Sequence, residues 1–505
     1  MSLSTTRRQF LKTAAVAGGA FGLGDLSFLS ELPRVRAGEA KLDTDIVRFR
    51  PEIEPLVRFL EATPRERLLE RVADRLRQGL GYQELLAALL LAGVRNIQPR
   101  PVGFKFHAVL VVNSAHLASV SSPDSDRWLP IFWALDYFKS AQEQDARGGD
   151  WTMSAVNESK VPTPAKAKRA FIEAMDNWDE AAADTAVTGL VRGLGANELF
   201  DLFAPYGARD FREIGHKAIY VANSWRTLQM IGWQHAEPVL RSLAYGLLDR
   251  GGDDNPAKAD LEADRPGRQN LARIKTIRPD WQAGQASPSA TKELLQVLRM
   301  ASPGEASAKV AEMLNHGVGV QSIWDGIFCA AGELLMRRPG IVSLHALTSA
   351  NAFHFAFQHS GNDEIRRLLL LQNAAFLTLF RGSEKMKSVQ IDQFPPAETP
   401  GAAGLSLEDI FAQISRDRMA ASRQVLAYLN KKQQPLDFIN AARRLVFLKG
   451  NNSHDYKFSS AVLEDYQSVS KEWRDRFLAA SVFNLRGSGE KDNALVNRTR
   501  AALAG

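Results

Sequence analysis

The sequence predicts an all-α protein whose repeated αα-hairpins pack as a closed or toroidal helical domain. Apolar residues recur at helical spacing along most of the chain, and the strict alternation of a β-strand is hard to find. Capping boxes with proline at the first helical position occur at Thr63-Pro64-Arg65-Glu66 and at Ser302-Pro303-Gly304-Glu305. A helix, a glycine pair and a second helix also recur along the chain, as in repeat architectures.

The glycine pairs define these repeats. They stand at Gly79-Leu80-Gly81, Gly193-Leu194-Gly195 and Gly317-Val318-Gly319, and Gln434-Pro435 takes their place in a fainter fourth copy. Because a glycine after a helix supplies the left-handed residue that ends it, we expect an αα-hairpin at each pair. The four pseudo-repeats then cover about residues 50–150, 165–250, 290–382 and 405–490 of one large helical domain, 38–505. Residues 250–287 and 382–404, rich in Gly and Pro, are predicted to be long loops.

The first 37 residues have the composition of a twin-arginine signal peptide. Arg7 and Arg8 precede Gln9-Phe10-Leu11-Lys12 and then an apolar, Gly/Ala-rich run that is too short to span a bilayer. Val35-Arg36-Ala37 ends in the small residue that a signal peptidase prefers. We therefore expect the twin-arginine translocase to export the folded chain to the periplasm or outside a bacterial cell. The alternative is an ordinary basic N-terminal arm.

The composition excludes several kinds of site. Cys329 is the only cysteine, which excludes intrachain disulfides, a haem-attachment motif and cysteine-bound metal clusters. A net charge of +6 spread over 505 residues does not predict nucleic-acid binding. The chain has no nucleotide-binding motif, and no later apolar stretch is long enough for a stable membrane span. Any metal must therefore be held by His, Asp, Glu or Lys.

Four histidines each follow the second helix of a repeat, near the start of another apolar helix: His107, His216, His345 and His454. If the repeats pack around a common axis, these positions converge, and we expect the imidazoles to form a metal site. Neutral imidazole binds iron, copper, zinc or nickel. The competing interpretation is a set of hydrogen-bonded core histidines. His235 is a reserve ligand, whereas His116 and His354 lie nine residues after His107 and His345, on the opposite helix face.

Lys457 lies three residues after His454 and therefore shares its helix face. A lysine held at a buried site loses its proton easily, and the neutral amine can take up carbon dioxide to form a carbamate, an anionic oxygen ligand. A solvated lysine in the first helical turn is the alternative, which spacing alone favours. Tyr220, Trp133 and Trp225 are candidates for a substrate pocket, although aromatic residues at helical spacing are more typical of core.

Four stretches of the sequence resemble the questin oxidase-like family. They are Phe106-His107-Ala108, His216-Lys217-Ala218-Ile219-Tyr220, Leu344-His345-Ala346-Leu347-Thr348-Ser349-Ala350 with its continuation to Gln372, and His454-Asp455-Tyr456-Lys457 with the helix to Ala480. Together they span most of the mature chain. Tyr220 is a departure, because the family usually has a second histidine at that position.

The resemblance implies a helical fold and oxygen-dependent chemistry. Fungal members of the family oxidise anthraquinone-type polyketides, with iron held by several histidines and a carboxylated lysine. Carried over to this sequence, it implies that the iron ligands are His107, His216, His345, His454 and a carboxylated Lys457. It also implies an aromatic or phenolic small molecule as the substrate.

We therefore expect an exported non-haem iron oxygenase or oxidase. The rival is a periplasmic helical-repeat scaffold that presents a binding surface and whose histidines merely pack. Solenoid repeats normally run about 20–50 residues, whereas the histidines here are 109 to 129 residues apart, which favours a closed helical domain. A zinc hydrolase is a third possibility, but no His-Glu-x-x-His helix supports it.

Overall fold

The computed structural model describes residues 45–381, 388–398, 405–431 and 434–505, and the regular structure within them is helical. These residues contain no β-strand, which confirms the predicted all-α class. Contacts group Val47–Gly505 into one unit. The predicted signal peptide, residues 1–37, lies outside the described residues.

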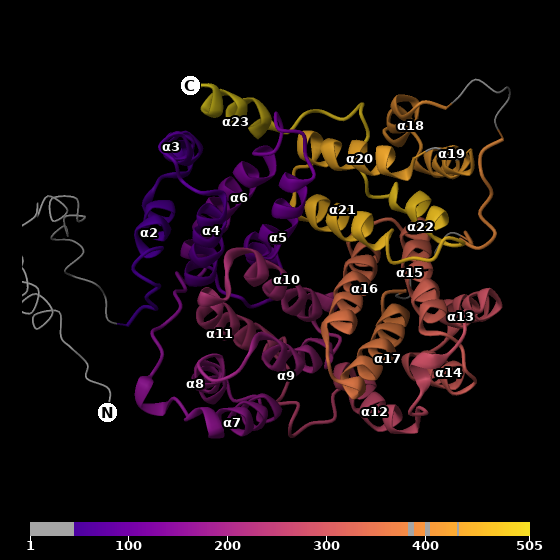
Figure 1. The fold of residues 1–505 in the computed structure, drawn as a ribbon, viewed down its shortest axis with the longest axis horizontal. Helices are drawn as coiled ribbons and strands as arrows, with labels where there is room; N and C mark the ends of the chain where they lie inside the picture. Colours follow the sequence, from indigo (N-terminus) through magenta and orange to yellow (C-terminus); the bar gives the residue numbers. More distant parts are fainter. Residues whose placement is uncertain (1–44, 382–387, 399–404, 432–433) are drawn as a thin grey trace, which may run out of the picture. The chain divides into compact units, whose positions relative to one another are not determined.

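One order of five helices occurs four times along this unit (Figure 1). The first set is α2 (Glu54–Ala62), α3 (Arg65–Arg77), α4 (Tyr82–Asn96), α5 (His107–Val120) and α6 (Leu129–Arg147). The second is α7 (Pro164–Asn177), α8 (Glu180–Val191), α9 (Ala196–Ala208), α10 (His216–Ile231) and α11 (Ala236–Leu247). The third is α13 (Pro288–Met300), α14 (Pro303–Asn315), α15 (Val320–Arg337), α16 (Ile341–His359) and α17 (Asp363–Leu379). The fourth is α18 (Leu407–Ile414), α19 (Arg418–Asn430), α20 (Pro435–Lys449), α21 (Ser453–Asp465) and α22 (Arg474–Ser481), and α23 (Ala494–Ala504) follows it.

The glycine pairs lie between the second and third helices of the first three sets. Gly79 and Gly317 have φ angles of 96° and 82°, so each follows its helix in the left-handed conformation that glycine favours. Gly193 does not adopt a positive φ. The helices that these turns join do not pack closely along each other, because α4 packs on α2 and α15 packs on α13. Consecutive helices pack closely later in the first and third sets, as in α5 with α6 and α16 with α17. In the second and fourth sets the first two helices do so, α7 with α8 and α18 with α19.

The fourth helix of each set lies at the centre of these contacts. α5 contacts α10, α10 contacts α16, α16 contacts α21, and α21 contacts α5, so the four contact one another in cyclic order (Figure 1). α5 and α16 are buried on every side over most of their length, as expected for helices that are apolar all round. Toroidal packing of the whole repeats stays a prediction.

Neighbouring sets meet through the same pair of helices at each junction. The fifth helix of one set packs on the third helix of the set before it: α11 on α4, α17 on α9, and α22 on α15. The first set meets the fourth in the same way, through α6 and α20. The outer contacts therefore follow the cyclic order of the central helices.

One of the two predicted loops is partly helical. Residues 250–287 include α12 (Arg265–Arg273), which has proline in its first turn and packs on α14 and α17. The prediction of a loop throughout was wrong. The Gly- and Asp-rich residues before α12 are typical of a loop, and the short amphipathic helix after them was not recognised. The other predicted loop, 382–404, has no helix in its described part, 388–398.

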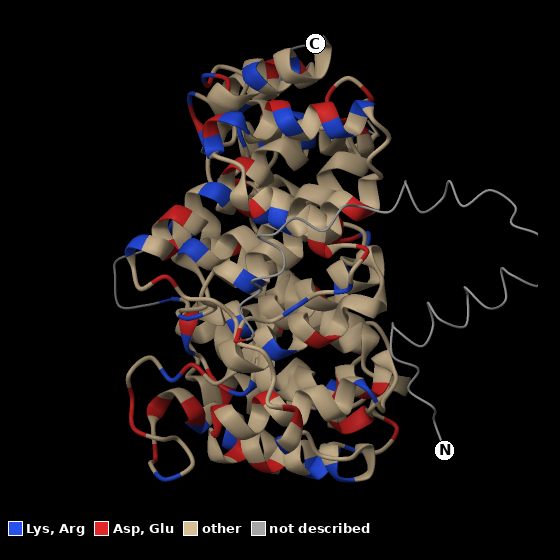
Figure 2. Cartoon of the chain, turned by 90° about the vertical axis from the view of Figure 1, so that its left-hand side faces the viewer, with Lys and Arg blue, Asp and Glu red and all other residues tan. Residues whose placement is uncertain are grey.

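Charged residues of both signs are intermixed on the face that Figure 2 presents. Some of the ion pairs extend into the interior, such as buried Arg95, which contacts Glu54 and Glu61 at 2.8 Å each. Within the described ranges, no helix combines the length and the apolar character that crossing a membrane requires.

The two glycines of the first turn provide a matched pair for testing this account. Gly79 has a φ of 96° and open space around it, whereas Gly81 is extended and its nearest neighbour leaves room for a methyl group. Because a left-handed conformation costs a residue with a Cβ about 1–2 kcal/mol, Gly79→Ala should lower the free energy of unfolding by that amount, measured by urea denaturation. Gly81→Ala should lower it by less than half as much. Equal effects would contradict a turn that depends on left-handed glycine.

Candidate metal centre

The four predicted histidines lie together where the central helices begin. His107 and His216 are the first residues of α5 and α10, and His454 is the second residue of α21. His345 lies one turn inside α16. Because the four helices contact each other in cyclic order, their histidines converge although they come from distant parts of the sequence.

The distances between the imidazole nitrogens are short. His216 Nε2 lies 2.9 Å from His107 Nε2 and 3.0 Å from His345 Nε2. His107, His345 and His454 each offer a ring nitrogen, and these three atoms lie within 4.8 Å of one another. The rings of His107 and His454 are also neighbours, with their centroids 4.8 Å apart. The four rings therefore follow the same cyclic order as their helices.

The second ring nitrogen of His216 and His345 determines the tautomer of each. Nδ1 of His216 lies 2.6 Å from the Glu213 carbonyl oxygen, and Nδ1 of His345 lies 2.6 Å from that of Ile341. A carbonyl oxygen only accepts, so both Nδ1 atoms carry the proton and both Nε2 atoms are bare in the neutral rings. The two Nε2 lone pairs thus face each other at 3.0 Å without a proton between them.

Burial keeps these imidazoles neutral. It lowers the pKa of His107, His216 and His345 well below the usual range, and the charge of nearby Lys457 lowers them further. His454 is less buried, and its pKa is lowered to about 4 for the same two reasons. The positive ends of α5, α10 and α21 also disfavour an imidazolium at this position. Neutral imidazole is the form that binds a metal ion.

The spacing of the nitrogens fits a shared metal ion. Two nitrogens bound at right angles to one metal through bonds of about 2.1 Å lie about 3.0 Å apart, whereas tetrahedral ligands lie about 3.4 Å apart. The distances of 2.9 and 3.0 Å from His216 to its two neighbours match the first arrangement. The set of donors therefore suits an ion with more than four ligands better than a tetrahedral zinc ion.

Lys457 is buried beside the histidines rather than solvated. Its side chain is 3% exposed, and its Nζ atom has no hydrogen-bond partner among the described residues. Burial lowers its pKa to about 7, and its charge acts on all four histidines. An amine that is half deprotonated near neutral pH is both a nucleophile and a potential ligand.

The backbone before His216 is strained. Glu213 and Ile214 have φ angles of 54° and 45°, and Gly215 follows with 84°. Ile214 is an outlier there, because a β-branched side chain disfavours the left-handed region. Each such residue costs about 1–3 kcal/mol and persists where its surroundings enforce it, commonly at functional sites. A Cβ atom on Gly215 would overlap Ser349 of α16, so glycine allows the start of α10 to lie against α16.

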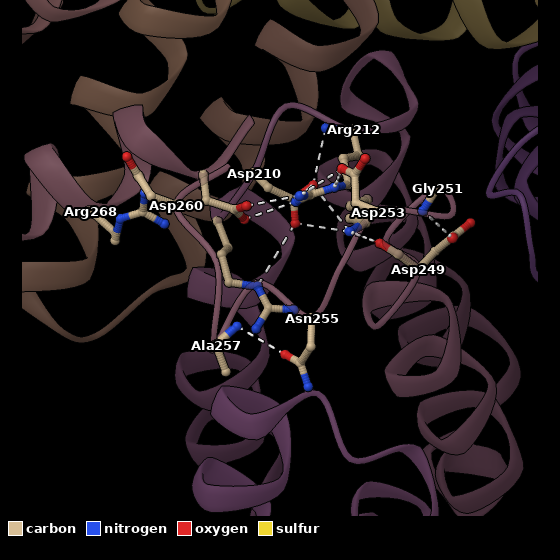
Figure 3. Close-up of polar contacts among 12 residues, drawn as sticks. Asp210, Arg212, Asp249, Gly251, Asp253, Asn255, Ala257, Asp260 and Arg268 are labelled. Carbon is tan, nitrogen blue, oxygen red and sulfur yellow. Dashed lines mark hydrogen bonds and ion pairs between the residues drawn. The ribbon is translucent and has the colours of Figure 1, made fainter. Parts of the chain in front are cut away.

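A network of charged residues holds this strained segment in place (Figure 3). Buried Arg212 donates two hydrogen bonds of 2.8 Å to Asp264 and contacts Asp253 at 3.2 Å. Lys217, adjacent to His216, binds Asp210 at 2.9 Å. The network fixes the first turn of α10 and, with it, the position of His216.

Glycines near the four helix starts are the site residues that the sequence analysis missed. Gly103, with a φ of 148°, lies against the His216 ring, and a Cβ there would be 3.3 Å from His216 Cε1. A glycine precedes each candidate histidine by at most five residues: Gly103, Gly215, Gly340 and Gly450. This recurrence was the signal available in the sequence.

The other histidines lie away from the cluster. His235 faces a separate cavity beside Arg50 and Glu52, so the structure does not bring the reserve candidate to the site. His116 contacts the Tyr82 hydroxyl at 3.1 Å, and His354 packs against Trp324 and Phe328. As expected, each lies on the helix face opposite to the candidate histidine of its own helix. His316 and His359 cap or end their helices.

The three aromatic pocket candidates take positions in the core. Tyr220 donates a hydrogen bond of 2.6 Å to Ser242, and Trp225 packs edge-on against Phe200. Trp133 stacks on Tyr456 with the ring centroids 4.0 Å apart, and so lies next to the segment that carries His454 and Lys457.

Comparison with protein families, with curated proteins and with solved structures gives no match for this chain.

The buried amine of Lys457 has a measurable consequence in protein treated with a chelator. The pKa of Lys457 is about 7 in the folded chain and 10.5 when exposed. Burying its amine in the folded chain therefore costs about 4 kcal/mol of stability at pH 7. Lys457→Met should raise the free energy of unfolding by about that amount, measured by urea denaturation.

The same shift fixes the sign of the pH dependence. The folded chain binds fewer protons than the unfolded chain between pH 7 and 10.5, so the wild type gains stability across this window. The advantage of Lys457→Met is constant below pH 7 and shrinks as the pH rises toward 10.5. If the difference in the free energy of unfolding between Lys457→Met and the wild type stayed unchanged from pH 7 to 10, burial would not lower the pKa of Lys457 as described.

Proposed function

We propose that this chain is an exported, metal-dependent oxidoreductase with a non-haem iron centre at His107, His216, His345, His454 and Lys457. The observation that carries the proposal is the pair of bare Nε2 atoms of His216 and His345, 3.0 Å apart, with both Nδ1 protons committed to backbone carbonyls. Neutral rings in this arrangement repel each other, and a shared cation removes the repulsion. The resemblance to questin oxidase-like proteins favours iron among the metals that imidazole binds.

Lys457 is proposed to act as a carbamate. Its neutral amine attacks the carbon of carbon dioxide: a new N–C bond forms, the π bond of one C=O breaks with its electron pair moving to that oxygen, and the nitrogen releases a proton. The product carries one negative charge on its carboxylate, which supplies an oxygen ligand beside four uncharged imidazoles. The unpartnered Nζ atom, buried against the histidines, supports this assignment.

The histidines would hold the metal, which when bound supplies redox chemistry and orients a small aromatic or phenolic substrate. The chain itself contributes a site almost closed to water, since His345 is fully buried and His107 and His216 are each 5% exposed. The helix N-termini around it favour negative charge on a bound group. Both effects stabilise an anionic ligand at this position.

Metal analysis of the purified protein tests the proposal. Wild-type protein, produced with its own N-terminal segment, should contain close to one iron per chain by mass spectrometry. His345→Ala should lose at least nine-tenths of it, because this ring is fully buried and shares a close nitrogen contact with His216.

Two histidines outside the cluster serve as controls. His235→Ala and His316→Ala should keep the iron content of the wild type, because the first faces another cavity and the second is exposed at the end of α14. Folded wild-type protein without metal would contradict the proposal and favour the helical scaffold.

The carbamate has a spectroscopic test of its own. Protein equilibrated with ¹³C-labelled bicarbonate should show a carbamate carbon by NMR, and Lys457→Arg should lack it, because a guanidinium does not add carbon dioxide under these conditions. Lys449→Arg is the matched control, since that lysine is paired with Asp492 at 2.7 Å. A carbamate signal that persists in Lys457→Arg would place the modification elsewhere.

A further inference from the structure

The central helices enclose a second feature at the end opposite the histidines. A cavity of about 570 Å³ lies among the C-terminal halves of α5, α10, α16 and α21, with α20 along one side. Volumes of this size are typical of sites for small organic molecules. Its apolar lining includes Leu117, Phe355, Ile439, Phe447 and Leu463.

This cavity leads toward Lys457. A much smaller cavity, lined by Lys457, begins within one turn of the histidines and shares Arg226, Asn351 and Ser460 with the large one. Arg226 donates hydrogen bonds to Asn351 and Glu464 at 2.9 and 2.7 Å. These polar residues from three central helices separate the large cavity from the small one.

The large cavity presents a cationic side chain that has no ion-pair partner among the described residues. Arg443 of α20 makes no hydrogen bond or ion pair with any residue that the structure describes, although Glu464 acts on it electrostatically. Glu464 is already paired with Arg226 at 2.7 Å. The remaining acid in the wall is Asp465, which is 1% exposed, and burial raises the pKa of its carboxyl well above the usual value. Arg443 is therefore the guanidinium group of the wall that lacks a paired carboxylate among the described residues.

Asp465 adds a second unused polar group. It is 1% exposed, one of its oxygens accepts a hydrogen bond of 2.7 Å from Asn351, and its Oδ2 atom has no partner in the described chain. A protonated carboxyl in this position has a hydrogen-bond donor to offer to an oxygen atom of a ligand.

We propose that this cavity binds a small aromatic carboxylate, whose charge pairs with Arg443 and whose ring packs against Phe355 and Phe447. A guanidinium binds a carboxylate through paired hydrogen bonds, and the apolar wall accepts the ring. Its role as the substrate site rests on the proposed metal centre, whereas the binding itself does not. The bound ring would lie on the route to Lys457, with the polar residues around Arg226 between them.

Two probes of equal shape test the proposal. Binding of 2-naphthoate and of 2-naphthamide is measured by titration calorimetry with the full protein, both after iron loading and after chelation. The wild type should bind naphthoate at least tenfold more tightly than naphthamide. Arg443→Gln should lose this preference and keep its affinity for naphthamide, which shows that the cavity is intact.

The matched control is the next residue of the same helix. Arg444 is half exposed and binds Asp126 at 2.9 Å, away from the cavity, so Arg444→Gln should keep the tenfold preference. Equal binding of the two probes by the wild type, or an undiminished preference in Arg443→Gln, would overturn the proposal. Selective binding by protein that takes up no iron would overturn the metal centre and leave the carboxylate site standing.

Discussion

Two bare imidazole nitrogens that face each other at 3.0 Å impose the constraint on which this structure depends. Neutral rings gain nothing from that contact, and burial prevents protonation from relieving it. The arrangement has to be enforced by the rest of the chain or satisfied by a cation. The fold supplies the enforcement through strained residues before His216, a glycine in contact with α16, and the network around Arg212. The strained residues lower the stability of the fold at this point, and a purely structural core does not require them.

The cyclic order of the central helices separates two chemical environments. At their N-terminal ends, Lys457 and three of the four histidines are buried, and the helix dipoles favour negative charge. At their C-terminal ends, the cavity is wide, and its wall carries polar groups without partners. Between the two environments lies the narrow space lined by Lys457, which shares Arg226, Asn351 and Ser460 with the large cavity.

The sequence predicted the secondary structure and the convergence of the histidines because both depend on local patterns that recur. The capping box at Ser302, where α14 begins, and the turn at Gly79 follow from capping and glycine rules that act within a few residues. The capping box predicted at Thr63 is not formed, because α3 has no side-chain cap and the Thr63 hydroxyl binds the Phe59 carbonyl. Which helices pack together does not follow from such rules, so the α2–α4 pair was not foreseen. Lys457 is a further example: spacing put it on the same face as His454, but only the packing of α5 and α21 made that face buried. Arg443 and Asp465 were missed because the cavity that gives them a role is formed by residues from all four repeats.

The four sets of helices repeat the position of the histidine, which explains why the histidines converge. The residue three positions after each histidine is not repeated, and this makes the site asymmetric. The residues three positions after His107, His216 and His345 are Leu110, Ile219 and Thr348, and in the fourth set that position is Lys457. A fully symmetric ring would present four identical uncharged donors to a cation and no group to balance its charge. In the proposed centre, a carboxylated Lys457 would supply that group and leave the other three sides free of charge. Successive histidines come from segments 109 to 129 residues apart, so the proposed centre could form only after the chain has folded. The proposed export of a folded chain would preserve such a centre.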